Sequence, residues 1–203
     1  MAIERLVIGT GNAGKVREIR DLLAGLPIGV VSLADFPGVQ PVEETGTSFL
    51  ENAAIKAAGF ARQLGEWVLA DDSGLEVDAL NGRPGVLSAR YGGDGIPDSR
   101  RAALLLEEMK AVPAASRKAR FRCVAALADP DRVHCVAEGR VPGRIAAGPA
   151  GDGGFGYDPV FVPEGYERTF AEMGLEIKQR LSHRARAVGR LREYLMKILE
   201  ADG

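Results

Sequence analysis

Hydrophobic residues along this chain follow two periods in turn, which predicts an alternation of strands and helices. Short apolar runs rich in β-branched residues are typical of buried strands, and apolar residues spaced three and four apart are typical of helices. Strands are predicted at residues 5–10, 28–33, 67–70, 75–79, 119–128, 132–141 and 160–162, with one more after Gly143. Helices are predicted at residues 15–23, from 48 to about 65, from 98 to 109 and from 182 to about 198. Strand–helix units followed by hairpin-like strands predict a mixed sheet in an α/β fold.

Local signals mark the ends of several predicted elements. Ser48 precedes an amphipathic segment and Glu51 follows three residues later, which is the pattern of a capping box. Gly65 is typical of a helix end, and Asp129-Pro130-Asp131 predicts the turn of a hairpin. No repeat or low-complexity linker interrupts the chain. We therefore expect one domain over residues 1–203, with two lobes and an active-site cleft between them.

Composition and charge place the chain among ordinary globular proteins. Its 203 residues are 46% hydrophobic and 27% charged, with a net charge of −2 and a sequence pI of about 5.8. These values predict neither a nucleic-acid surface nor a membrane surface. The first residues lack a signal-peptide pattern, and no apolar run approaches the ~20 residues that span a bilayer. Cys123 and Cys135 show no CxxC spacing, so we expect buried thiols in a reducing compartment and a cytoplasmic protein.

Two adjacent carboxylates, Asp71 and Asp72, follow the apolar run at residues 67–70 and precede Ser73-Gly74. A strand that ends there delivers acidic side chains to the rim of a sheet, where α/β proteins place their ligands. Because successive strand residues point to opposite faces, the two carboxylates cannot face the same way. One of them can hold a metal or a water while the other braces the turn. An ordinary Asx turn without a ligand is the alternative.

The segment from Gly9 to Val16 matches two phosphate-binding patterns and departs from both. As a P-loop it has Val16 in place of the hydroxyl residue that would hold Mg²⁺. As a dinucleotide fingerprint it is followed by Asp35, which lies 21 residues after Gly14, near where a ribose-binding acid would fall. In both cases backbone N–H groups at a helix start, beside Lys15, predict an anion site. A structural turn without a ligand stays the alternative.

A second acidic pair, Glu43-Glu44, lies just ahead of the helix that Ser48 caps. Together with Asp71-Asp72 it offers oxygen ligands for a hard cation such as Mg²⁺, which often takes one or two carboxylates plus substrate phosphates. Lys56 lies two turns into that helix, on the face expected to look back toward the acidic loop. Taken alone, the glutamates are typical of a solvated loop.

A glycine-rich loop and the last helix carry the remaining candidate residues. Phe155, between glycines, can lie flat against a base, and Asp158 can accept from a ring N–H. His134 lies in a predicted strand and is interpreted as structural, whereas His183 at an exposed helix start is the better functional candidate. No HExxH motif is present, so acid–base chemistry falls to carboxylates.

The motifs, taken in order, closely resemble those of the inosine/xanthosine triphosphate pyrophosphatases. That resemblance implies an elongated α/β fold with a central mixed sheet, Mg²⁺ dependence and a homodimer. It also implies hydrolysis of ITP, dITP and XTP to the monophosphate and pyrophosphate. The blocks that carry it are Thr10–Lys15, Glu43–Gly46, Glu51–Ala53, Ala70–Leu75, Pro84-Gly85, Ser88–Tyr91, Gly154–Pro159 and Ser182–Arg184.

Carried over residue by residue, the resemblance assigns a role to each motif position. The phosphate loop would consist of Thr10, Gly11, Asn12, Ala13, Gly14 and Lys15. Glu43 and Asp72 would bind the metal, and Asp72 would also accept a proton. Ser73, Lys56 and Lys178 would be further substrate contacts. The base would be held by Phe155, Gly156, Tyr157, Asp158, His183 and Arg184.

Two other classes of function stay open from the sequence. A dinucleotide-dependent oxidoreductase would use the glycine-rich fingerprint and Asp35, but it leaves both acidic pairs unexplained. A non-catalytic nucleotide-binding or RNA-contacting module predicts tight binding of nucleotides without turnover. It would not need carboxylates around a metal.

Overall fold

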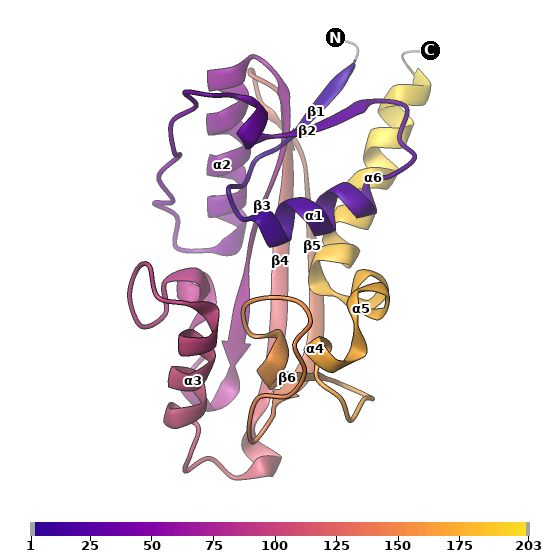
Figure 1. The fold of residues 1–203 in the computed structure, drawn as a ribbon. Helices are drawn as coiled ribbons and strands as arrows, with labels where there is room; N and C mark the ends of the chain where they lie inside the picture. The colour runs from indigo at the N-terminus through magenta and orange to yellow at the C-terminus, as the bar shows by residue number, and fades with distance from the viewer. Residues whose placement is uncertain (1–2, 202–203) are drawn as a thin grey trace. The chain divides into compact units, whose positions relative to one another are not determined.

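The computed structural model describes residues 3–201, which form a mixed α/β arrangement (Figure 1). The strands are β1 (Arg5–Ile8), β2 (Gly29–Ser32), β3 (Trp67–Val77), β4 (Lys118–Ala128), β5 (Val133–Ile145) and β6 (Phe161–Pro163). The helices are α1 (Ala13–Leu22), α2 (Phe49–Leu64), α3 (Asp98–Glu108), α4 (Phe170–Met173), α5 (Leu175–Leu181) and α6 (His183–Ala201). Short 3₁₀ segments and loops connect them.

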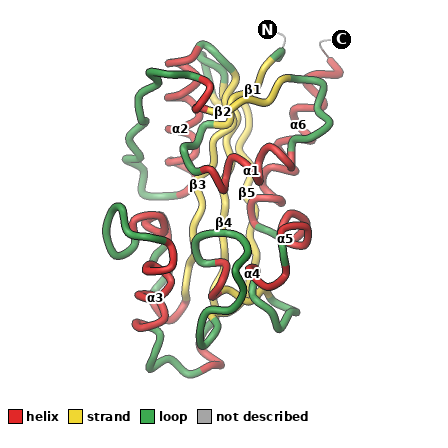
Figure 2. Tube along the Cα trace, in the orientation of Figure 1, coloured by secondary structure: helices red, strands yellow, loops and turns green. Residues whose placement is uncertain are grey.

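The strands form one sheet in the order β2-β1-β3-β4-β5-β6 (Figure 2). β1 pairs in parallel with both β2 and β3, whereas β5 and β6 are antiparallel. The predicted mixed sheet is therefore confirmed. Because β1 lies between the next two strands of the chain, the connections that leave β1 and β2 run in opposite directions across the sheet. Such a topological switch point is where open α/β sheets bind ligands, beyond the carboxyl ends of the strands.

Contacts divide the chain into two compact units, each built from several segments. The first unit comprises residues 1–72, 123–139 and 184–203, and the second comprises residues 73–122 and 140–183. Neither unit is continuous in sequence, because strands β3, β4 and β5 contribute to both. The single domain with a cleft between its lobes stays a prediction.

In the first unit, alternate strand residues face two different helix layers. Leu69 and the residues of the same parity pack against α1 and α6, forming a core of Leu6, Ile8, Ile19, Leu23, Trp67, Leu69, Cys123, Ala125, Leu127, Val188, Leu191 and Leu195. The intervening residues face α2, as the proximity of Phe60 to Val68 and Ala70 around Gly9 shows. Figure 1 shows α2 and α6 on opposite sides of these strands. This parity decides which way each residue further along β3 points.

The second unit has its own core, which is rich in aromatic rings. Phe121 of β4 lies 4.6 Å from Phe161 of β6 and 6.2 Å from Phe170 of α4, measured between ring centroids. Leu105 of α3 and Met109, which follows α3, belong to the same buried cluster. It also includes Leu75 and Val77 of β3. Offset and tilted aromatic pairs of this kind add packing energy beyond their buried area.

The strand through the paired aspartates differs from the prediction. Residues 67–70 and 75–79 were expected to be two strands around a turn, but β3 runs unbroken from Trp67 to Val77. Gly74 is required by close packing instead of by a turn, since a Cβ there would overlap Gly85 O and Ser88 Oγ. The Ser88 hydroxyl accepts from Leu75 N at 2.9 Å. Side-chain partners compensate the carboxylates within the strand, so burying them does not end it.

Other parts of the chain follow the predictions only in part. Residues after Gly143 continue β5 instead of starting another strand. The hairpin turn is confirmed, because Asp129 Oδ1 accepts from Asp131 N and Arg132 N at 2.9 Å each. The short helices α4 and α5 were not predicted, since each is too short to show a helical period. Among the described helices, none is both long and apolar enough to cross a membrane.

The capping box at the start of α2 is confirmed and provides a test of the fold. Ser48 Oγ accepts from Glu51 N at 3.2 Å, and Glu51 Oε2 accepts from Ser48 N at 3.1 Å. The predicted end is also confirmed, since Gly65 has the left-handed backbone of a C-cap at φ 67°.

We expect Ser48→Ala to lower the free energy of unfolding by about 1 kcal/mol, because it removes this cap. Urea denaturation followed by circular dichroism measures the change. Ser116→Ala, at an exposed serine outside the named helices, is the control and should shift the midpoint much less. Equal shifts for both variants would contradict the capping role.

Candidate active site

The predicted phosphate loop follows β1 directly and joins the start of α1. Gly9 N donates to Leu69 O at 2.7 Å, which ties the end of β1 to β3. α1 begins at Ala13, two residues before the predicted start, so Gly14 and Lys15 lie in its first turn. The loop therefore stands at the switch point, with backbone N–H groups of a helix start beside it.

Polar side chains of the loop order its backbone. Asn12 is the N-cap of α1 and its Oδ1 accepts from Lys15 N at 3.0 Å. Thr10 Oγ1 accepts from Asn12 N at 3.2 Å. A surface cavity of about 330 Å³ adjoins this loop and is lined by Thr10, Gly11, Ala13, Val16, Arg17, Arg20, Asp21, Ser32 and Ala34. The exposed arginines on α1 make its surroundings favourable for an anion.

Asp71 and Asp72 point to opposite faces of β3, as predicted. Asp71 has the parity of Leu69 and faces α1 and α6, where it meets Lys15 and Arg184. Asp72 has the parity of Ala70 and faces α2, where it meets Asn52 and Lys56. Neither carboxylate braces a turn, contrary to the role expected for one of them. The strand instead presents one acid to each helix layer.

Asp71 is fully buried between two cations. Its Oδ2 lies 3.1 Å from Lys15 Nζ and 3.2 Å from Arg184 Nε. Arg184, at 1% exposure, also forms an ion pair with Glu18. Burial by itself would raise the pKa of Asp71, but Lys15 and Arg184 outweigh it and hold that pKa far below the usual range. Asp71 is therefore a permanent anion at neutral pH.

Asp72 has a different environment on the α2 face. Its Oδ1 lies 3.4 Å from Lys56 Nζ, and its Oδ2 accepts from Asn52 Nδ2 at 3.2 Å. Lys56 Nζ also lies 3.0 Å from Glu44 Oε2. Burial, with a smaller contribution from Glu44, raises the pKa of Asp72 even though Lys56 and Lys15 oppose the shift. A carboxylate with a raised pKa is a stronger proton acceptor.

Sequence reasoning gave no role to Asn52 and Glu18, which the structure brings into these clusters. Asn52 precedes Lys56 by one helical turn, and its Oδ1 accepts from Gly46 N at 2.8 Å. Glu18 follows Lys15 by three residues on α1. Residues three and four apart share a helix face. The spacing of Asn52 from Lys56 and of Glu18 from Lys15 was therefore the sequence signal that could have placed them in these clusters.

The acidic loop presents its two glutamates differently. Glu44 is half-buried and pairs with Lys56, whereas Glu43, the predicted metal ligand, is exposed. Carboxylate oxygens from Asp72 and this loop are the donors that Mg²⁺ prefers, and Mg²⁺ commonly completes its shell with water and phosphate. Among residues 3–201, no group of three or more His, Cys, Asp or Glu side chains is arranged as a preformed metal cage. The donor set therefore fits a cation bound together with substrate phosphates.

In the second unit, the glycine-rich loop is tied to α5 by a buried ion pair. Asp158 Oδ2 lies 2.6 Å from Lys178 Nζ and accepts from Phe155 N at 2.8 Å. Lys178 Nζ also lies 4.4 Å from the centre of the Phe155 ring, which is a cation–π contact. Gly154 is needed here, because its φ is 75° and a Cβ would overlap the Asp158 carboxylate. The hydrogen bond to its backbone and the cation–π contact with its ring together hold Phe155 in place.

Tyr157 and His183, two further candidates for binding the base, are buried and contact other residues of the protein. Tyr157 donates its hydroxyl to Ser88 O at 2.9 Å, and burial raises the pKa of this phenol. His183 was expected at an exposed helix start, but only 4% of it is exposed. Its ring is stacked on Phe121 with the centroids 4.6 Å apart. The expectation of exposure is wrong because α6 begins inside the packed aromatic core.

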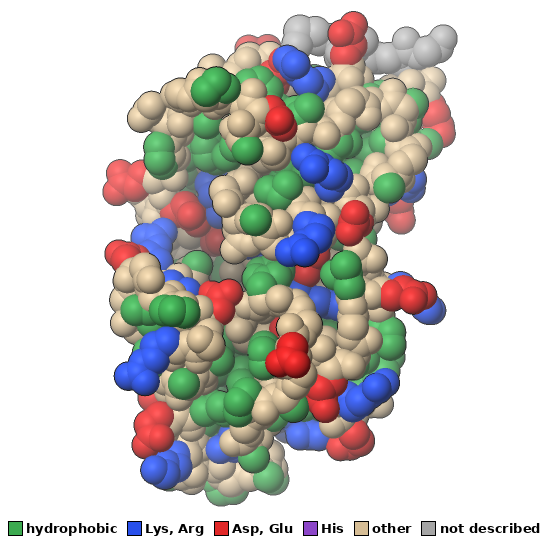
Figure 3. All heavy atoms as spheres, viewed as in Figure 1, with side chains coloured by type: hydrophobic (Ala, Val, Ile, Leu, Met, Phe, Trp, Pro, Cys, Tyr) green, Lys and Arg blue, Asp and Glu red, His purple; other side chains and the backbone are tan. Residues whose placement is uncertain are grey.

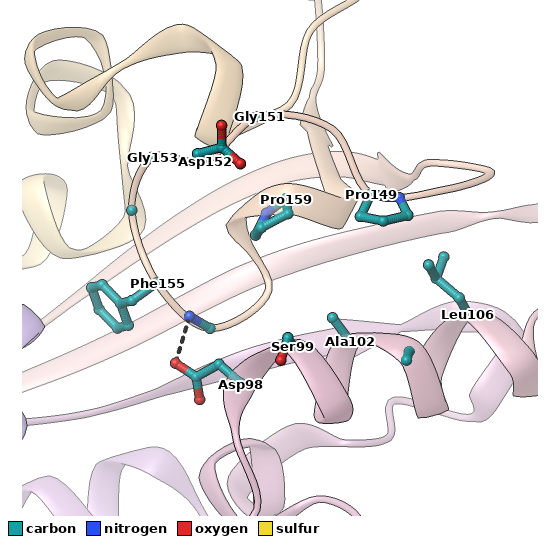
Figure 4. Close-up of a pocket in the computed structure, with 13 residues that line it drawn as sticks. Asp98, Ser99, Ala102, Leu106, Pro149, Gly151, Asp152, Gly153, Phe155 and Pro159 are labelled. Atoms are coloured by element: carbon teal, nitrogen blue, oxygen red, sulfur yellow. Dashed lines mark hydrogen bonds between the residues drawn. The ribbon is translucent and has the colours of Figure 1, made fainter.

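The same loop borders a cavity of about 430 Å³ (Figure 4). One wall is α3, with Asp98, Ser99, Ala102 and Leu106, and the other is the loop between Pro149 and Pro159. Asp98 Oδ2 accepts from Gly156 N at 2.9 Å, which joins the two walls. Phe155 stands at the edge of this hollow.

Ser73, a predicted substrate contact, follows Asp72 in β3 and is half-buried.

Asp35 and the surface bear on the alternative functions. Asp35 Oδ2 accepts from Ser32 N at 2.8 Å and from Ser32 Oγ at 3.2 Å, so the proposed ribose ligand caps its own turn. Acidic and basic side chains intermingle over the face in Figure 3, without a large basic area among the described residues on that face. Both observations weigh against the dinucleotide and nucleic-acid interpretations.

A loop at a topological switch point, leading into a helix start with buried acids and lysines around it, is typical of α/β proteins that bind phosphorylated ligands. The model of the Ham1 family matches residues 6–194, and the chain belongs to that family. This confirms the family predicted from the motifs.

Relatives and solved structures agree with this placement. A dITP/XTP pyrophosphatase of Geobacillus kaustophilus is 49% identical over 201 residues, covering 99% of this chain and 98% of the relative. Another, from Thermus thermophilus, is 53% identical over 190 residues, covering 93% of this chain and 90% of the relative. The structure of a HAM1 protein from Coxiella burnetii has a TM-score of 0.86 and 39% identity, covering 97% of this chain and 100% of that one. The predicted α/β fold is thereby confirmed.

The two glutamates of the acidic loop can be separated by experiment. If Mg²⁺ binds here together with substrate phosphates, Glu44→Gln should weaken activation by Mg²⁺ and lower activity by at least about tenfold, because Glu44 adjoins both Lys56 and the Asp72 site. The exposed Glu43→Gln serves as the comparison, and titration of activity with MgCl₂ measures both. A larger loss for Glu43→Gln would assign the metal to Glu43, as the sequence predicted.

Proposed function

We propose that this chain is a nucleoside triphosphate pyrophosphohydrolase that converts dITP, XTP and ITP to the monophosphate and pyrophosphate. It would clear deaminated purines from the nucleotide pool. Relatives named dITP/XTP pyrophosphatase support this over nearly the whole chain. The structural observation that carries it is Asp72, a buried carboxylate with a raised pKa held by Lys56 and Asn52.

The triphosphate is bound by the first unit in this proposal. Backbone N–H groups at the start of α1 and the Lys15 ammonium meet its phosphate oxygens. Lys56 adds a second ammonium on the other face of β3, where the charges of Asp72, Asp71 and Glu44 outweigh the effect of burial and raise the pKa of Lys56. Lys56 is then cationic at neutral pH, and its charge adds to that of the Lys15 ammonium. They offset negative charge that would otherwise repel an incoming nucleophile.

Hydrolysis requires a water whose proton is accepted as the phosphorus is attacked. Asp72 is the acceptor: burial makes it more basic, and the Asn52 amide and Lys56 fix its orientation. Asp72 and a glutamate of the acidic loop would hold a Mg²⁺, which would supply positive charge to the phosphate oxygens. Attack at the α-phosphorus releases pyrophosphate as a unit.

The base is recognised in the second unit. The Phe155 ring offers a flat face for stacking, and Lys178 offers N–H donors close to that ring. A 6-oxopurine presents an acceptor where adenine presents an N–H₂ donor. Unpaired donors facing adenine would exclude it, since buried polar groups without partners are costly.

Two further properties belong to this proposal. A cytoplasmic location is consistent with the free thiols of Cys123 and Cys135, which suit a reducing compartment. A homodimer is implied by the family resemblance, and equilibrium sedimentation tests it.

The specificity is tested by comparing kcat/KM for ITP, XTP and ATP with Mg²⁺ in a pyrophosphate-release assay. We expect ATP to be hydrolysed at least about 10⁴-fold less efficiently than ITP, because the donors near the base would stay unpaired. Lys178→Met should reduce this ratio, whereas Lys118→Met, at an exposed lysine, should leave it unchanged. Comparable efficiency for ATP and ITP would defeat the assignment. Tight binding of ITP without turnover would favour a non-catalytic module.

The role of Asp72 is tested by Asp72→Asn, which nearly preserves shape but removes charge and basicity. We expect kcat to fall by about 10²–10⁴-fold or more, with circular dichroism unchanged. Asp131→Asn, at the exposed hairpin turn, is the control.

Reaction in ¹⁸O-labelled water completes the test, since attack at the α-phosphorus places the label in the monophosphate. Label in pyrophosphate, or near-normal kcat for Asp72→Asn, would contradict the mechanism.

A further inference from the structure

Asp71 cannot touch a substrate, yet it contacts a residue that the proposed function places on the phosphates. Its side chain has no exposed surface, and one oxygen, Oδ2, meets both Lys15 Nζ and Arg184 Nε. The other oxygen, Oδ1, is buried and has no hydrogen-bond partner among the described residues. Oδ2 also accepts from the buried Cys123 thiol, whose Sγ lies 3.7 Å away. The charged groups through which Asp71 can act on the reaction are therefore these two cations.

Lys15 needs such a partner because of its own flexibility. A lysine ammonium is a compact charge on a four-carbon stem, and fixing the stem costs rotamer entropy. The ion pair with Asp71 at 3.1 Å already orders the Lys15 side chain in the folded protein. Less entropy is therefore lost when a phosphate binds. An ammonium has three N–H donors, and this ion pair requires only one of them. The side chain of Lys15 is 14% exposed, whereas that of Asp71 has no exposed surface.

Arg184 and Glu18 make the burial of Asp71 possible. Without Arg184, the carboxylate would depend on one lysine that must also serve the ligand. Arg184 is buried and meets Asp71 on one side and Glu18 on the other. The four residues Glu18, Arg184, Asp71 and Lys15, here called the charge cluster, carry two positive and two negative charges. A balanced buried cluster avoids the large cost of an unpaired charge.

We propose that Asp71 is a positioning residue that holds the Lys15 ammonium at the phosphate loop, with Arg184 as its fixed counter-ion. The identity of the nucleotide in this inference rests on the proposed function. The positioning itself concerns any polyphosphate. It gives Arg184 a part in phosphate binding that does not require contact with the base.

A double-mutant cycle on Asp71 and Lys15 tests the proposal with inorganic tripolyphosphate as the ligand. Calorimetry measures its Kd for the full chain, for Asp71→Asn, for Lys15→Met and for the combined variant. We expect each single variant to weaken binding by about tenfold, and Asp71→Asn to change Kd by less than about twofold when Lys15 is already Met. Losses that multiply in the combined variant, or Asp71→Asn binding like the unmodified chain, would overturn the proposal.

Glu18→Gln is the matched control, because it removes another buried acid of the charge cluster that pairs with Arg184. We expect its tripolyphosphate Kd to stay within about twofold of the unmodified chain, even where its melting temperature falls. A tenfold loss there would show that general damage to the cluster, not the holding of Lys15, weakens binding, and would overturn the proposal.

A charge-balanced variant covers the case in which Asp71→Asn does not fold. Asp71→Asn with Arg184→Gln removes one anion and one cation, leaving Lys15 and Glu18. Because tripolyphosphate has no base, a base contact of Arg184 cannot affect the measurement. We expect the same tenfold weakening, and unmodified affinity would contradict the proposal.

Turnover separates this inference from the proposed function. With ITP as substrate, Asp71→Asn should raise KM while the ITP-to-ATP ratio of kcat/KM stays constant, a split that general destabilisation would not produce. If the unmodified chain binds tripolyphosphate in the expected pattern but hydrolyses no 6-oxopurine triphosphate, the proposed function fails and the positioning role stands. If it hydrolyses ITP while Asp71→Asn has an unchanged KM and Kd, the positioning role fails alone.

Discussion

The compensation of two adjacent carboxylates within β3 is the constraint on which the first unit depends. An ionised group taken out of water is strongly destabilising unless opposite charges and hydrogen bonds meet it. Asp71 obtains these from Lys15 and Arg184, and Asp72 from Lys56 and Asn52. Their partners come from α1, α6 and α2, so the same ion pairs that allow the strand to continue also hold three helices against the sheet.

This arrangement gives two chemically similar side chains different properties. Both carboxylates are buried, but Asp71 shares one oxygen between two cations, and its pKa is held far below the usual range. Asp72 has Lys56 at a longer distance and Glu44 nearby, and burial dominates, so its pKa is raised. An acid that stays ionised at neutral pH is suited to holding a cation in place. An acid that accepts one more readily is suited to general base catalysis.

The second unit solves a different problem, that of presenting an aromatic ring from a loop made largely of glycine. Such a loop has high conformational entropy when it is free. The Asp158–Lys178 ion pair and the bond from Phe155 N to Asp158 remove that freedom without adding bulk at the surface. Phe155 then has a fixed position, and the loop that carries it lines a cavity.

The sequence by itself determined the types of the longer elements, the α2 cap at Ser48, the family, and the placement of Asp71 and Asp72 on opposite faces. These follow from local periodicity, capping chemistry and motif order, which can be recognised without knowing which distant residues come into contact. Only the tertiary structure decided that β3 runs through both aspartates, that Glu44 instead of Glu43 meets Lys56, and that His183 is buried. Each of these depends on partners far along the chain, such as Arg184 for Asp71, and burial and ion pairing between distant segments exist only once the sheet and helices are packed.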